Sequence, residues 1–124
     1  MWVDQLAPDN DRHSFVAERE RAAVGFVTVG TADDAALAGV GELFAIYLEP
    51  AAVGSGVGRA LIAQATAALA ARGFAEAILW VLEGNARARR FYELAGWRSD
   101  GARKDDERNG AVRHELRYHT RLRQ

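Results

Sequence analysis

The stretch Val53-Gly54-Ser55-Gly56-Val57-Gly58-Arg59 lies between an apolar segment, 42–48, and a segment with helical spacing, 59–72. Three glycines in five residues allow the backbone to turn tightly and to bring its N–H groups close to an anion. The following helix start adds unpaired donors and a partial positive charge, so the pattern predicts a phosphate or pyrophosphate site. A phosphate-loop NTPase does not fit because no Gly-Lys-Ser/Thr closes the motif. The Rossmann pattern fits poorly because these glycines occupy every second position.

The two segments beside this loop have different apolar patterns, which predict a strand before the loop and a helix after it. Segment 42–48 is almost continuously apolar, which predicts a strand buried on both faces and ended by Pro50. Segment 59–72 is predicted as a helix, with Gly73 as its C-cap. The helix is indicated by apolar residues at helical spacing, namely Leu61, Ala65, Ala68 and Leu69.

A second apolar strand and a second helix follow. Segment 77–82 is again fully apolar, and 85–95 is predicted as a helix that stops at Gly96. One side of this helix carries Ala88, Phe91, Leu94 and Ala95. The chain is then expected to end in a strand pair, 97–100 and 111–122, around a polar loop at 101–110. On the last strand one face carries Val112, Leu116, Tyr118 and Leu122.

The N-terminal third predicts a hairpin, with strands at 14–17 and 22–30 around the charged run Glu18–Arg21. Before it, the i, i+4 spacing of Trp2 and Leu6 suits the last turn of a helix. We therefore expect an α+β fold with a β-β-β-α-β-α-β-β order.

Length and composition predict one domain, 1–124, because 124 residues can bury one core and not two. The net charge of −1 does not provide the basic face that nucleic-acid binding needs, so no nucleic-acid partner is expected. Cysteine is absent, and no His/Asp/Glu cluster has metal-ligand spacing, so no metal is predicted. No apolar run approaches the ~18–20 residues that span a bilayer, so we expect no membrane partner and a cytoplasmic location.

The chain resembles the GNAT N-acetyltransferase superfamily over 15–122. That family carries a loop of the form Q/R-x-x-G-x-G/A, matched here by Gly56 and Gly58. Its later signature, roughly N-x-x-A-x-x-x-Y-x-x-x-G-F/W, is matched by Asn85, Ala88, Tyr92, Gly96 and Trp97. The resemblance implies a central mixed, mostly antiparallel sheet flanked by helices, and transfer of the acetyl group of acetyl-CoA to an amine.

Two departures from the family pattern affect these expectations. Val53 stands where the family has Gln or Arg, which removes one polar contact to the pyrophosphate, and Arg59 is a partial replacement. A typical member begins with a strand and one or two helices that we do not find here. We therefore expect an N-terminally shortened fold, with 2–6 as the tail of that region.

The resemblance also assigns the cofactor contacts. The pantetheine arm of acetyl-CoA would pair with the backbone along Ile46, Tyr47 and Leu48. The pyrophosphate would bind the loop that begins at Val53, through the backbone N–H groups of Gly54, Ser55, Gly56, Val57, Gly58 and Arg59. Asn85 would anchor the pantetheine arm; alternatively it is only a helix N-cap. Arg89 is the choice for the 3′-phosphate, whereas Arg87 and Arg90, or all three arginines, would form a solvated helix face.

Tyr92 is the predicted general acid, because a phenol with a pKa near ~10 can protonate a thiolate whose thiol has a pKa near ~8.5. The alternative is a buried aromatic residue, a role that suits Phe91 better. Glu42 is the predicted general base and Glu83 the second choice, and either could be a solvated strand-end residue. His114 and His119 are interpreted as strand-face residues.

Two other functions remain open at this point. The chain could be a non-catalytic acetyl-CoA-binding module, as the shortened start and Val53 suggest. It could also be a partner domain or fragment that completes its fold as a homodimer, because missing elements leave a sheet edge or apolar face to cover. A nucleotide-binding enzyme would require ATP or NAD to bind in preference to CoA.

Overall fold

The computed structural model describes the backbone of residues 2–6 and both backbone and side chains of residues 11–123. The chain divides into two compact units, Met1–Ala77 with Arg121–Gln124, and Ile78–Thr120. Each unit is described by itself below.

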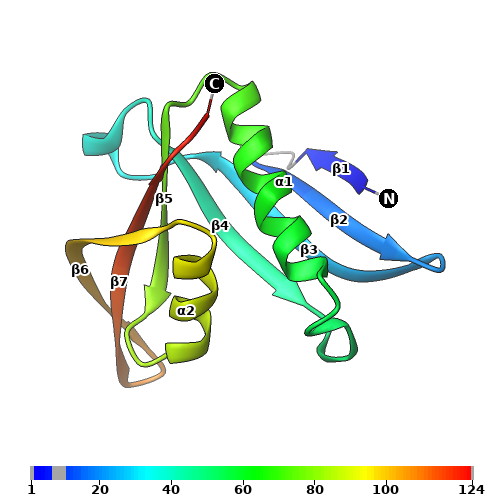
Figure 1. The fold of residues 1–124 in the computed structure, drawn as a ribbon. Helices are drawn as coiled ribbons and strands as arrows, with labels where there is room; N and C mark the ends of the chain where they lie inside the picture. The colour runs from blue at the N-terminus through cyan, green and yellow to red at the C-terminus, as the bar shows by residue number, and fades with distance from the viewer. Residues whose placement is uncertain (1, 7–10, 124) are drawn as a thin grey trace. The chain divides into compact units, whose positions relative to one another are not determined.

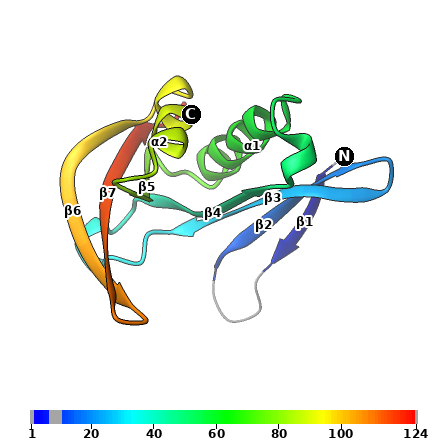
Figure 2. The same ribbon diagram turned by 90° about the horizontal axis from the view of Figure 1, so that it is seen from below.

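The first unit is an antiparallel sheet with a helix along one face (Figures 1 and 2). Its strands follow one another in the order of the chain: β1 (Trp2–Leu6), β2 (His13–Arg19), β3 (Ala22–Thr31) and β4 (Gly41–Leu48). Two short 3₁₀ turns, η1 (Ala35–Leu37) and η2 (Pro50–Ala52), flank β4, and α1 (Val57–Ala71) comes next.

The predicted hairpin is confirmed, and its turn is tighter than expected. Strands β2 and β3 extend toward each other until only Glu20 and Arg21 separate them, and both have positive φ, 53° and 67°. Two consecutive left-handed residues form the hairpin turn whose twist matches that of the strands.

Helix α1 is confirmed and begins two residues earlier than predicted. It buries residues at i, i+4, i+5, i+8 and i+12, which face the sheet: Val57, Leu61, Ile62, Ala65 and Leu69. Close packing requires a glycine on β3, because a Cβ on Gly25 would lie 3.0 Å from Leu61 Cδ1 and 2.7 Å from the Tyr47 carbonyl oxygen. Gly73, with a φ of 93°, ends the helix as predicted.

The second unit contains α2 (Ala86–Leu94), β6 (Arg98–Arg108) and all but the outer ends of β5 (Glu76–Leu82) and β7 (Ala111–Arg121), with β7 between β5 and β6. Its core includes Leu79, Trp97 and Tyr118, all essentially inaccessible to solvent. The α+β prediction, with a mostly antiparallel sheet flanked by helices, is confirmed.

Two predicted segments are wrong. Residues 2–6 form strand β1, which pairs with β2, and not a helical turn. The hydrogen bonds that β1 makes with β2 outweigh the weak helical signal of two apolar residues, Trp2 and Leu6, at i, i+4 spacing. Residues 101–110 are not a loop. Most of them belong to β6, whose charged side chains pair across to β7, as Lys104 does with Glu115, and the turn is Asn109-Gly110 with φ of 52° and 78°.

Candidate active site

The glycine loop of the first unit adopts a conformation that only glycine takes easily. Gly54 has a φ of 83° and Gly56 a φ of 91°, and a Cβ at either position would meet nothing within 4 Å. These glycines are therefore required by the backbone angle and not by lack of space. Gly56 is the N-cap of α1 and brings the loop directly into the helix.

The first turn of α1 presents unpaired donors. Its first internal bond runs from Ala60 N to the Gly56 oxygen at 3.1 Å. Within residues 11–123, no acceptor is recorded for the N–H groups of residues 56–59, whereas those of Val53 and Ser55 bond within the loop at 3.2 and 3.1 Å. No acidic residue lies in this turn. The arrangement suits an anion at 56–59.

Strand β4 contains a bulge that the sequence did not indicate. Ala45 pairs with Thr28 and Leu43 with Val29, so Phe44 is an extra residue without an opposite partner. Residues five apart in a regular strand point to opposite faces, but the bulge places Glu42 and Tyr47 on the same face.

The predicted burial of β4 on both faces is wrong. Ala45 and Tyr47 are exposed, and Tyr47 stacks on Phe26 with ring centroids 5.9 Å apart. An apolar run predicts burial only if another layer covers both faces, and α1 covers the face opposite to this pair. Ile46 and Leu48, which alternate with them, are half-buried.

The two carboxylates considered as general base are differently placed. Glu42 is buried, with 8 % of its surface exposed, and its Oε1 accepts the Asp33 N–H at 3.3 Å. It lies about 17 Å along β4 from Tyr47, so it can act on that end only through a chain of several water molecules. Glu83, in the second unit, is ion-paired with Arg103 at 2.9 Å.

Asn85 is the N-cap of α2, because its Oδ1 accepts the Ala88 N–H at 3.1 Å. This bond engages the oxygen and leaves the amide nitrogen as a donor. The capping interpretation is confirmed, and the pantetheine contact stays a prediction.

Tyr92 is the buried residue of α2, with 8 % of its surface exposed, whereas Phe91 is only half-buried. The expectation that Phe91 is the better buried of the two is therefore wrong. Burial raises the pKa of Tyr92 to about 12, because the phenolate would lose its hydration. Against a thiol near ~8.5, complete proton transfer from Tyr92 would cost about 5 kcal/mol. The Tyr92 hydroxyl is therefore better suited to donate a hydrogen bond to a thiolate than to give up its proton.

Arg89 is engaged inside the second unit. Its Nε donates to the Tyr118 hydroxyl at 3.0 Å and its Nη1 to the Glu83 carbonyl at 3.1 Å. Arg87 and Arg90 are exposed on the same helix. Tyr118 was recognised in the sequence only as one of an alternating apolar row.

The predicted residues therefore fall into two sets. The first unit holds Glu42, Ile46–Leu48 and Val53–Arg59, and the second holds Asn85, Arg89 and Tyr92. His114 Nδ1 lies 2.7 Å from Asp105 Oδ1 on exposed strand faces.

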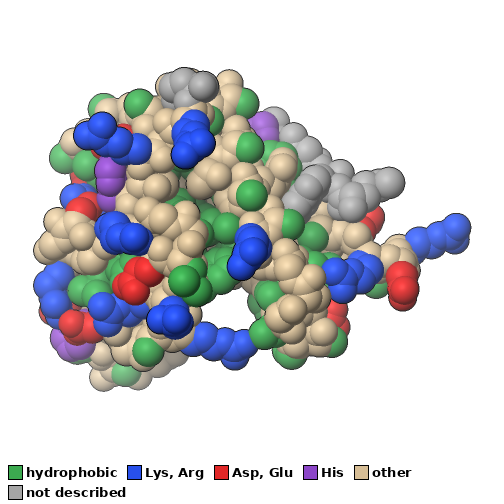
Figure 3. Space-filling view, in the orientation of Figure 1, with side chains coloured by type: hydrophobic (Ala, Val, Ile, Leu, Met, Phe, Trp, Pro, Cys, Tyr) green, Lys and Arg blue, Asp and Glu red, His purple; other side chains and the backbone are tan. Residues whose placement is uncertain are grey.

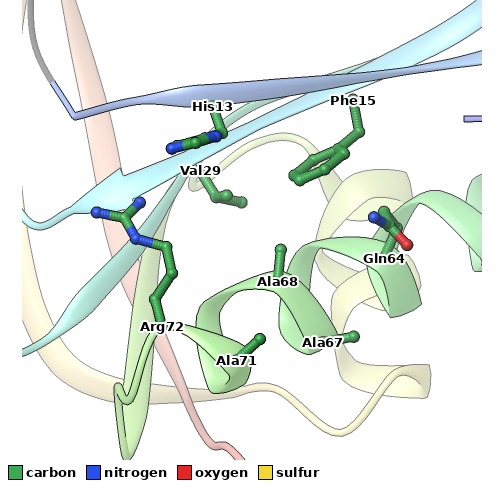
Figure 4. A pocket seen from close by; sticks show the side chains of 8 residues that line it. All are labelled: His13, Phe15, Val29, Gln64, Ala67, Ala68, Ala71 and Arg72. Carbon is green, nitrogen blue, oxygen red and sulfur yellow. The ribbon is translucent and has the colours of Figure 1, made fainter. Parts of the chain in front are cut away.

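A groove of about 360 Å³ lies in the first unit between α1 and strands β2 and β3 (Figure 4). Its floor is formed by alanines of α1 and its walls by Phe15 and Val29. Arg72, at one end, is ion-paired with Asp11 at 2.9 Å. None of the predicted site residues lines this groove.

Surface charge, metal ligands and helix hydropathy are three further features that could mark a site. Basic and acidic side chains are interspersed on the face seen in Figure 3. Among the described residues, no group of three or more His, Asp or Glu side chains could hold a metal ion, and no helix is long and apolar enough to cross a membrane.

Known proteins whose sequences resemble this chain include acetyltransferases. A sequence model of the acetyltransferase (GNAT) family matches residues 2–97. The mycothiol acetyltransferase of Thermobispora bispora is 36 % identical over 85 residues, 67 % of this chain and 29 % of that protein. The uncharacterized N-acetyltransferase YuaI of Bacillus subtilis is 39 % identical over 72 residues, 57 % of this chain and 42 % of that protein. The chain thus spans less than half the length of either relative.

Solved structures show the same fold. The ribosomal-protein-alanine N-acetyltransferase from Brucella melitensis matches with a TM-score of 0.78 and 25 % identity, over 90 % of this chain and 69 % of that one. A phosphinothricin acetyltransferase from Sinorhizobium meliloti in complex with AcCoA matches with a TM-score of 0.74 and 23 % identity, over 90 % of this chain and 61 % of that one.

Proposed function

This chain belongs to the acetyltransferase (GNAT) family, and we propose that it transfers the acetyl group of acetyl-CoA to a primary amine by direct attack. The observation that carries the proposal is the open N-terminus of α1 behind a left-handed glycine turn, with four backbone N–H groups available to an anion. The proposal treats residues 1–124 as a single acetyltransferase domain. A cytoplasmic location stays a prediction.

The cofactor contacts divide between backbone and side chain. The N–H groups of 56–59 would bind the pyrophosphate, with Val53, Gly54 and Ser55 shaping the turn before them. The backbone of Ile46–Leu48 would pair with the pantetheine arm, which does not depend on the side chains there. The free amide nitrogen of Asn85 would donate to the same arm. Arg89 would reach the 3′-phosphate only by exchanging its present bonds, so an exposed arginine of α2 fits that contact better.

In the reaction, the amine nitrogen bonds to the thioester carbonyl carbon and the C–S bond breaks. The nitrogen loses a proton, for which Glu42, acting through a chain of water molecules, is the proposed acceptor. Tyr92 donates a hydrogen bond to the sulfur as negative charge develops on it, and the thiolate finally takes a proton from solvent, which balances the proton lost by the amine. Since the pKa of Tyr92 is about 12, stabilising the charge is the larger part of its contribution.

Calorimetric titration with acetyl-CoA, with ATP and NAD as controls, tests the cofactor assignment. Micromolar binding of acetyl-CoA alone is the expected result, despite the missing polar side chain at Val53. Tighter binding of ATP or NAD than of acetyl-CoA would instead indicate a nucleotide-binding enzyme. No binding by folded protein would contradict the proposal.

A non-catalytic acetyl-CoA-binding module is the second candidate. Val53 favours it because this side chain offers no polar contact to the pyrophosphate. The high pKa of Tyr92 favours it because the phenol gives up its proton to a thiolate only at a cost. Tight acetyl-CoA binding without acetylation of any amine in a panel of polyamines, amino-acid amides and aryl amines would support it.

The homodimer predicted from the sequence stays a prediction, and one surface gives it a test. Phe26 and Tyr47 are 37 % and 52 % exposed although they stack on each other. If two copies associate there, Phe26→Ser should convert a dimer into a monomer in light scattering. A wild-type protein that is monomeric at all concentrations would exclude the dimer.

A further inference from the structure

The Tyr118 side chain joins β7 to α2 in the interior of the second unit. Tyr118 is completely buried, with 0 % of its surface exposed. Its hydroxyl accepts the Arg89 Nε–H at 3.0 Å and donates to Glu93 Oε2 at 2.5 Å. Arg89 and Glu93 are four residues apart, so both lie on the face of α2 that looks toward β7. One hydroxyl therefore bridges a cation and an anion of the same helix face.

Both of these bonds are charge-assisted, and such bonds are roughly twice as strong as neutral ones. Burial raises the pKa of Tyr118, which keeps the phenol protonated and able to donate at neutral pH. Arg89 extends the connection, because its Nη1 bonds the Glu83 carbonyl just before α2 begins. The helix is thereby tied at one point to β7 and at a second to the end of β5.

Helix α2 has little apolar packing to replace this tie. It has nine residues, and Tyr92 is its one buried residue; Leu94 is 75 % exposed. Helices this short are marginal without tertiary contacts. Its other recorded polar ties, the Asn85 cap and the bond from Arg98 to the Glu93 carbonyl, come from residues next to it in sequence and do not orient it against β7.

The same helix carries Tyr92, the proposed hydrogen-bond donor to the sulfur. Tyr92 precedes Glu93, and its ring meets the Tyr118 ring edge-on at 6.4 Å and the Trp97 ring at 6.5 Å. Rotation of α2 about its axis would move the Tyr92 hydroxyl directly. We propose that Tyr118, with its hydroxyl held between Arg89 and Glu93, is a positioning residue that fixes the rotation of α2 and so the place of the Tyr92 hydroxyl. This inference rests on the proposed acetyl transfer.

The test is a double-mutant cycle between Tyr118→Phe and Tyr92→Phe, with the amine of the panel that gives the highest rate as acceptor. Tyr118→Phe keeps the ring and removes the hydroxyl. We expect it to lower kcat about tenfold, because displacements near 1 Å can cost up to about a hundredfold, with the KM for acetyl-CoA changed less than about twofold. In the Tyr92→Phe background the same substitution should change kcat less than about twofold, because a residue that acts through Tyr92 has nothing left to position.

Further variants cover the case in which Tyr118→Phe fails to fold. Glu93 is an exposed helix residue, so Glu93→Ala should fold and reproduce the kcat loss, whereas Glu93→Gln keeps an acceptor oxygen and should restore most of the activity. Leu94→Ala, its exposed neighbour, is the matched control and should leave kcat unchanged.

Three results would overturn the inference: full activity of Tyr118→Phe, an equal loss of kcat in both backgrounds, or equal loss for Glu93→Gln and Glu93→Ala. Failure of the proposed function is distinguishable from these, because wild-type protein would then bind no acetyl-CoA or acetylate no amine before any variant is compared.

Discussion

The two helices of this protein are held in place by different forces. Helix α1, which carries the glycine loop, buries five apolar residues against its sheet. Helix α2, which carries Tyr92, buries one residue and depends on a bridged charge pair for its orientation. Apolar packing tolerates small changes in geometry, whereas hydrogen bonds weaken steeply with distance and angle. The position of the proposed anion site should therefore tolerate substitutions nearby, whereas the position of the Tyr92 hydroxyl should depend on the hydrogen bonds of α2.

The largest effect should come from α1. Leu61 is completely buried, so Leu61→Ala should lower the free energy of unfolding by about 3 kcal/mol. Leu94→Ala on α2 should change it by less than about 0.5 kcal/mol, because that side chain is exposed. Urea denaturation measures the free energy of unfolding of both variants. Equal losses would contradict the inference that apolar burial holds α1 more strongly than α2.

An alkaline pH should destabilise the second unit through Tyr92. Its pKa is raised from 10 to about 12 by burial, so the unfolded chain ionises first as the pH rises above 10. Stability is complete below pH 10 and is lost as the pH rises from 10 toward 12, by about 1.4 kcal/mol at pH 11 from this group. Comparison of urea midpoints for wild type and Tyr92→Phe at pH 8 and 11 isolates this loss. An identical pH dependence in the two proteins would show that Tyr92 is not buried in this way.

The glycine loop can be tested with a matched pair of substitutions. Gly56 and Gly73 have φ near 90°, and neither has an atom within 4 Å of an added Cβ. Gly56→Ala and Gly73→Ala should therefore each cost about 1–2 kcal/mol of stability from backbone strain. Only Gly56→Ala should weaken acetyl-CoA binding in calorimetry. Equal weakening by both substitutions would argue that the loop is a turn and not a ligand site.

The smallest effect should separate the two roles of Asn85. Asn85→Ala should cost about 1 kcal/mol because the cap of α2 is lost. Asn85→Asp keeps a capping oxygen and loses the donor nitrogen, so it should retain stability but bind acetyl-CoA more weakly. Unchanged acetyl-CoA affinity of the Asp variant would leave capping as the sole role of Asn85.

Features that depend on local spacing could be predicted from the sequence. The helix at 59–72, the hairpin and the glycine turn follow from periodicity and from residues that favour particular backbone angles. Strand β6 was predicted too short, at 97–100, although Asn109-Gly110 is a recognised hairpin turn pair and would have indicated that the strand continues to it.

Features that depend on distant partners could not be predicted. The bulge at Phe44 is defined by its register with β3, and the burial of Tyr92 rather than Phe91 by contacts with Trp97 and Tyr118. The hydroxyl of Tyr118 meets Arg89 across 29 positions of the chain, and no local pattern marks that bond. Burial raises the pKa of Tyr92, so its chemistry also required the structure.

The most direct test measures acetylated amine and released CoA thiol together, for wild type and Tyr92→Phe at saturating acetyl-CoA. We expect equal amounts of the two products from the wild type. We also expect a kcat about a hundredfold lower for Tyr92→Phe, with acetyl-CoA affinity unchanged. Absence of acetylated amine, or equal kcat for both proteins, would contradict acetyl transfer assisted by Tyr92.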